Sequence, residues 1–88
     1  MIKVILFKNN LVLIARLEEV GSEMGEPDCK ITDPFELKGG EYLESWPSFS
    51  MQRSMMVHSD SFLTILEPDK NHLDKYQALT AQNVTEKS

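Results

Sequence analysis

Few residues in this chain carry side chains that could do chemistry. Its only cysteine is Cys29, and its two histidines are His58 and His72. A thiol and an imidazole can form a nucleophile and its base, but catalysis also needs an orienting group and an oxyanion site, and no spacing here proposes either. One cysteine and two histidines cannot fill a zinc site at a recognisable spacing. We therefore expect no enzyme activity, no metal and no cofactor.

Loop motifs that bind phosphate or calcium are not recognisable either. Gly39-Gly40 is not followed by the Lys-Ser/Thr pair of a phosphate loop. The acids Glu23, Glu26 and Asp28 do not have the spacing of a calcium loop. We expect these residues to serve as turn and surface positions.

Negative charge is concentrated in one stretch of the sequence. The net charge is −5, and between residues 18 and 44 nine acids face only Lys30 and Lys38. Binding to phosphates depends on Lys and Arg displacing counterions. Any nucleic-acid binding must therefore be local and lie away from this stretch. The nine acids are Glu18, Glu19, Glu23, Glu26, Asp28, Asp33, Glu36, Glu41 and Glu44.

The length of 88 residues allows one domain with a small core. Domains of this size are marginally stable alone and often add disulfides, metals or oligomerisation. A single cysteine excludes a disulfide within the chain and fits a reducing compartment. Met1–Phe7 lacks the features of a signal peptide, and no apolar run approaches the roughly 20 residues of a membrane span. We expect a cytoplasmic protein with no membrane partner, either well packed as a monomer or oligomeric.

The first twenty residues predict a β-hairpin. The apolar runs Ile2–Phe7 and Leu11–Leu17 are separated by Asn9-Asn10, and Asn tolerates the positive φ angles of a tight turn. Alternate residues from Leu11 to Leu17 share one face, while Val12 and Ile14 lie on the other. Apolar residues on both faces indicate burial on both sides, in a curved barrel, at an interface, or both.

The middle of the chain predicts a loop followed by a broken strand. Val20–Asp28 is a loop, and Cys29–Asp33 is a short strand that Pro34 interrupts or ends. Phe35–Leu37 resumes the strand after a bulge, and Gly39-Gly40 makes a further turn. The segment 42–50 has no clear pattern.

Two more strands follow, at Met51–Val57 and Ser61–Leu66, with His58-Ser59-Asp60 as a tight connection. Five short strands in this order predict a mainly β fold, a small and strongly bent five-stranded barrel. From residue 69 the apolar period becomes helical, which predicts a short C-terminal helix over about 69–81. The domain thus covers 1–82, and 83–88 form a flexible tail. The helical stripe consists of Leu73, Tyr76 and Leu79.

The last two strands carry little charge to guard their edges. Pairing them between neighbouring subunits would close a ring and remove both edges. The residues expected at this interface are Met51, Arg53, Met55, Val57, Phe62, Thr64 and Leu66.

These segments together resemble the Sm-like family, which includes the LSm proteins and bacterial Hfq. Val4–Leu11 and Leu13–Leu17 are similar to its first motif, with Ala15 in the place of a small glycine. Cys29–Asp33 looks like the following strand. Met56–Ile65 is similar to the second motif, a short strand, a three-residue turn and a final strand. The resemblance implies an Sm-like barrel in a homo-oligomeric ring of about five to seven subunits.

The resemblance also implies RNA or single-stranded nucleic acid as a partner, bound at the ring pore. His58, Ser59 and Asp60 would face the pore, where an imidazole can stack on a base, and Met24 would stand in the family's base pocket. The family's Arg-Gly is replaced here by His58-Ser59. Two alternatives remain open: a protein-interaction ring of the same architecture without nucleic acid, and a monomeric barrel whose helix covers the open edge.

Overall fold

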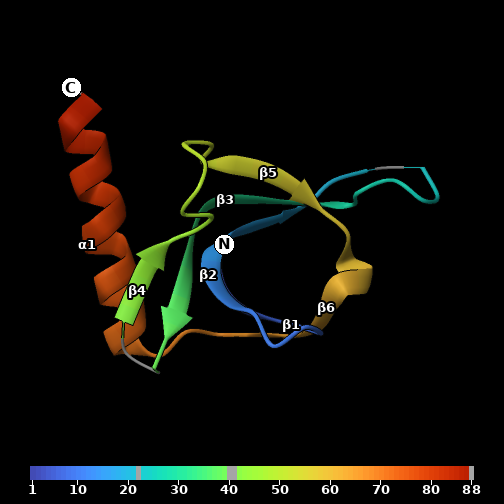
Figure 1. The fold of residues 1–88 in the computed structure, drawn as a ribbon, viewed down its shortest axis with the longest axis horizontal. Coiled ribbons are helices and arrows are strands. Elements are labelled where there is room, and N and C mark those ends of the chain that lie inside the picture. The colour runs from blue at the N-terminus through green and yellow to red at the C-terminus, as the bar shows by residue number, and fades with distance from the viewer. Residues whose placement is uncertain (22, 40–41, 88) are drawn as a thin grey trace.

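The computed structural model describes residues 1–21, 23–39 and 42–87, with side chains as far as residue 81. It is a mainly β fold with a C-terminal helix (Figure 1). The elements are β1 (Ile2–Phe7), β2 (Val12–Glu19), β3 (Cys29–Lys38), β4 (Tyr42–Ser45), β5 (Ser54–Val57), the 3-10 turn η1 (Ser59–Ser61), β6 (Phe62–Leu66) and α1 (Lys70–Lys87).

The sheet is antiparallel, with the order β4-β3-β2-β1-β6, and β5 pairs with β3. Six strands are described, so the prediction of five is wrong. The additional strand is β4, which lies in the segment 42–50, where the residues show no clear pattern. The sheet curls strongly (Figure 1), but β5 and β6 do not pair with each other within the described chain, so the sheet is not closed.

The predicted hairpin is confirmed. β1 and β2 pair antiparallel from Ile2↔Arg16 to Leu6↔Val12. Asn10 has a φ of 72°, and the Asn9 side chain accepts a hydrogen bond from the backbone N–H of Leu11 at 3.1 Å. Short polar side chains tolerate this left-handed conformation, which explains the Asn pair at the turn.

Pro34 does not end the third strand. β3 continues through Pro34. Asp33 has a φ of 51°, and the pairing of β3 with β2 shifts register at this point, between Ile14 and Arg16 of β2. The first half of β3 pairs with β5 and the second half with β4, both on the edge opposite β2. The Pro34 carbonyl accepts a hydrogen bond from Trp46 N–H at 3.0 Å. Two short strands therefore share one long neighbour.

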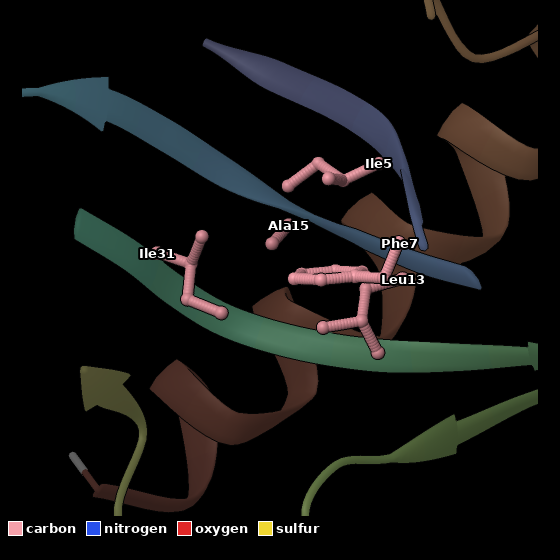
Figure 2. Packing of buried hydrophobic residues seen from close by; sticks show 5 residues of the cluster. All are labelled: Ile5, Phe7, Leu13, Ala15 and Ile31. Carbon is pink, nitrogen blue, oxygen red and sulfur yellow. The ribbon is translucent and has the colours of Figure 1, made fainter. Parts of the chain in front are cut away.

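Apolar residues pack on both faces of the sheet, as the second strand predicted. On one face, inward side chains of β1, β2 and β3 form the main core (Figure 2). On the other face, Ile14 and Phe35 pack against Tyr76 of α1. The second face is thus covered by the chain's own helix, whereas we expected curvature and an interface to bury it. The main core consists of Ile5, Phe7, Leu13, Ala15 and Ile31.

The helix is longer than predicted. It begins at Lys70, close to the expected start, but its backbone continues to Lys87 through the segment predicted as a tail. Asp69 caps its first turn, because its carboxylate accepts the His72 N–H at 2.9 Å. Of the expected stripe, Tyr76 is completely buried and Leu73 and Leu79 are half-buried. Gly40 and Ser88 lie outside the described residues.

Candidate interaction site: two open strand edges and the turn between them

Three described strands, β4, β5 and β6, have one strand partner each, and of these β4 carries a charged residue, Glu44. β5 pairs with β3 and β6 pairs with β1, and neither has a second partner among the described strands. Neither strand contains a charged residue. Large apolar side chains on them are exposed, among them Leu63 at 67%, Met56 at 46% and Leu66 at 46%. Strand edges of this kind are templates for pairing with another chain.

Five of the seven predicted interface residues lie on β5 and β6. Met55, Val57 and Phe62 pack partly against the main core. Phe62 also contacts Phe7 edge to face, with ring centroids 5.1 Å apart. Thr64 and Leu66 lie exposed on β6. Their exposure leaves β6 able to contact a partner without disturbing the core.

Met51 and Arg53 lie before β5, because the strand begins at Ser54 and not at Met51 as predicted. Arg53 explains the late start. Its guanidinium donates to Ser45 Oγ and to the Ser50 carbonyl at 3.1 Å, which folds this segment back towards β4. The guanidinium is thus already engaged within the chain, while Met51 is exposed in the loop.

The turn between the two edges is held by a residue far away in the sequence. Asp28 accepts the Ser59 N–H at 2.8 Å through Oδ1 and the Ser59 hydroxyl at 2.6 Å through Oδ2. Within the turn, the His58 carbonyl accepts the Ser61 N–H at 3.1 Å and the Ser61 hydroxyl at 2.7 Å. Asp28 thus satisfies a donor that a neighbouring side chain would normally cap.

His58 is exposed, and its side chain makes no capping hydrogen bond. Asp60 is also exposed in the turn. The sequence placed Asp28 only in the loop and gave no signal for its contact, since 31 residues separate it from Ser59.

The hydrogen bonds from Ser59 hold the pKa of the Asp28 carboxyl below its ordinary value of 3.8. Because the pKa is lowered in the folded state, this contact stabilises the fold at pH values above 3.8. The stabilisation is lost as the pH falls through the lower folded value. Burial, and secondly the charge of Asp28, raise the pKa of the Cys29 thiol, which is only 4% exposed. A buried neutral thiol is a poor nucleophile.

Met24 lies at the tip of the same loop and is completely exposed. A turn closed by the Glu26 N–H and the Glu23 carbonyl at 3.0 Å, with Gly25 at a φ of 89°, presents it. The loop projects beyond the sheet (Figure 1). Asp28 at the base of the loop, and not Met24 at its tip, makes the contact to the turn.

Several cations are paired with acids of the same chain. Ion pairs join Lys3 to Glu67, Lys38 to Glu44 and Lys70 to Asp74. In the described part of the chain, no three His, Cys, Asp or Glu residues lie together in a way that could hold a metal ion. No helix there is long and apolar enough to cross a membrane.

The fold and these edges define a class of protein: a curled antiparallel sheet with a helix over one face and two edge strands, β5 and β6, that carry no charge. Residues 1–81 match the model of a family of unknown function, DUF6561, and the chain belongs to that family. None of the curated proteins compared with the chain matches it.

Proposed function

We propose that this chain is the subunit of an Sm-like homo-oligomeric ring, in which β5 of one copy pairs with β6 of the next. The observation that carries the proposal is the pair of open, uncharged strand edges, one on each side of a single short turn. A subunit that pairs through two different edges makes head-to-tail contacts. Such contacts form a ring when the rotation between successive copies adds up to a full circle.

The order of elements supports the Sm-like part of the proposal. A first hairpin, a strand after a loop, and a final strand-turn-strand unit occur in the order that the resemblance implies. The last strand returns to pair with β1, and the strand before the turn pairs with β3. The helix lies over the face of β2 and β3 that contains Ile14 and Phe35, so it leaves the edges of β5 and β6 free for about five to seven copies to join.

A charge placed on the outer edge should weaken assembly. Leu66 is half exposed on β6, so Leu66→Glu leaves the main core intact. We expect it to weaken subunit association by tenfold or more, roughly the effect of burying one unpaired charge at an interface. Sedimentation velocity over a concentration series measures this change.

The matched control is Met24→Glu, which adds the same charge at a fully exposed loop position. It should leave association as in the wild type. Equal association constants for Leu66→Glu and the wild type would contradict the role of β6.

Nucleic acid is one candidate ligand of the proposed ring, and the exposed side chain of His58 is the observation that favours it. Its imidazole is exposed, makes no cap bond and stands on a turn fixed by Asp28 and Ser61. An aromatic ring held in this way can stack on an unpaired base. In a ring of Sm type, copies of this turn would converge at the pore.

His58→Ala should reduce affinity for short uridine- and adenine-rich oligonucleotides about tenfold, because one stacking contact is worth roughly 1–3 kcal/mol. His58→Phe keeps an aromatic face and should retain most of the affinity. Fluorescence anisotropy at fixed salt measures both variants. Unchanged binding by His58→Ala would exclude the pore mechanism.

The acidic stretch and the paired cations favour the other alternative, a ring that binds proteins. A pull-down with and without nuclease separates the two. Partners lost after nuclease treatment support nucleic acid as the ligand, and partners retained support protein assembly.

A further inference from the structure

The contact between Asp28 and Ser59 lies at the end of the β3–β5 ladder and joins the loop before β3 to the turn after β5. Asp28 ends the loop between β2 and β3, and Ser59 begins the turn between β5 and β6. Both oxygens of the Asp28 carboxylate accept hydrogen bonds from Ser59, at 2.8 Å and 2.6 Å. A backbone bond from Val20 N–H to the Asp28 carbonyl, at 3.0 Å, closes the base of the loop. The backbone of Asp28 is thus bonded to the loop, and its side chain is bonded to the turn.

This contact lies between the end of β5 and the start of β6, so it affects the relative direction of both open edges. The last ladder pair of β3 and β5 is Cys29↔Val57, so the next residues along each strand are Asp28 and His58. The chain then has the four residues 58–61 in which to turn from β5, which pairs with β3, to β6, which pairs with β1. Whatever fixes this turn also fixes the direction in which β6 leaves β5.

We propose that Asp28 is a positioning residue that sets the angle between the two open edges and thereby the closure of the ring. The inference rests on the proposed function, since it concerns the same two strands. In a head-to-tail ring, the angle between the two contact surfaces of one subunit decides how many copies close the circle. A free turn would let that angle vary, and rings of several sizes or open chains would form.

The test uses Asp28→Ala, which removes both hydrogen bonds to Ser59, and Ser59→Ala, which removes the hydroxyl bond but keeps the bond from the Ser59 N–H to Asp28 Oδ1. Glu26→Ala is the matched control, because it removes an acid from the same loop whose carboxylate accepts the Glu23 N–H within its own turn. Asp28→Asn is the rescue variant, since it keeps an oxygen that can accept the Ser59 N–H. Native mass spectrometry counts subunits, and hydrogen exchange follows the Ser59 amide.

We expect the wild type and Glu26→Ala to give one subunit number and Asp28→Ala to give several. Ser59→Ala keeps the N–H bond to Asp28 and should stay close to the wild-type number. In Asp28→Ala the Ser59 amide should exchange about tenfold faster, because a charge-assisted hydrogen bond is lost. Asp28→Asn should restore most of the single ring size. A merely stabilising role for Asp28 would lower the melting temperature without changing the subunit number.

An Asp28→Ala protein with the wild-type subunit number would overturn the role of Asp28 in ring closure, whatever its Ser59 exchange, and leave the ring standing. A monomeric wild-type protein would overturn the ring itself, and with it any role of Asp28 in assembly. The two failures are therefore distinguishable.

Discussion

Replacing Tyr76 with alanine is expected to lower the free energy of unfolding by about 3–5 kcal/mol, as for other large buried aromatic side chains. Tyr76 is completely buried between α1 and the sheet. Its ring meets Phe35 edge to face at 5.8 Å, and its hydroxyl donates to the Thr32 carbonyl at 3.1 Å. Its loss would leave a cavity over Ile14 and loosen the helix from the sheet. Urea unfolding followed by circular dichroism measures the change.

Tyr76→Phe separates packing from the hydrogen bond. It keeps the ring and should cost about 0.5–1.5 kcal/mol, the net value of one hydrogen bond. If both variants cost less than 1 kcal/mol, the helix would not be the cover of this face.

The hydroxyl of Tyr76 also predicts a change of stability in alkali. Burial raises its pKa to about 12 from the ordinary value of 10. The raised pKa contributes stability below pH 10 that is lost as the pH rises towards 12. In Tyr76→Phe this part of the alkaline loss should be absent.

Giving both edges the same charge is expected to convert the proposed ring into monomers. A first variant carries Met56→Glu with Leu66→Glu, and a second carries Met56→Lys with Leu66→Lys. Both positions are exposed at 46%, so the subunit itself should fold. Every β5–β6 contact within one variant would then bring like charges together, which costs several kcal/mol. Size-exclusion chromatography with light scattering should find a monomer in each case.

An equal mixture of the two variants should assemble again, because each contact then joins opposite charges. Only an alternating ring with an even number of subunits satisfies every contact. Light scattering and the composition of the mixed peak measure this outcome. Oligomers formed by either variant alone, or a mixture that stays monomeric, would contradict pairing between β5 and β6.

Local patterns in the sequence predicted the parts of the fold that depend on neighbours in the chain. The Asn9-Asn10 turn, the apolar runs beside it and the helical stripe around Tyr76 each act over a few residues, and each was found. β4 was missed because Tyr42–Ser45 is short and half exposed, and pairs with β3 only after the bend at Asp33. The start of β5 was placed too early because nothing in the residue type of Arg53 indicates that its guanidinium bonds to Ser45 Oγ and the Ser50 carbonyl.

The candidate site was predictable in part. The unguarded composition of β5 and β6 is visible in the sequence, and the structure places both strands at open edges. The contact of Asp28 with Ser59 was not predictable, because nothing in the residue types of two loops 31 positions apart indicates that they meet. Only the pairing of β3 with β5 brings them together.

Native mass spectrometry of the purified wild-type protein, without nuclease treatment, tests the proposed assembly most directly. We predict one discrete closed oligomer of about five to seven subunits, whose mass is an integer multiple of the 10.1 kDa chain. Bound oligonucleotide would appear as additional mass on that species. A protein that remains monomeric at micromolar concentration would contradict the pairing of the two open edges.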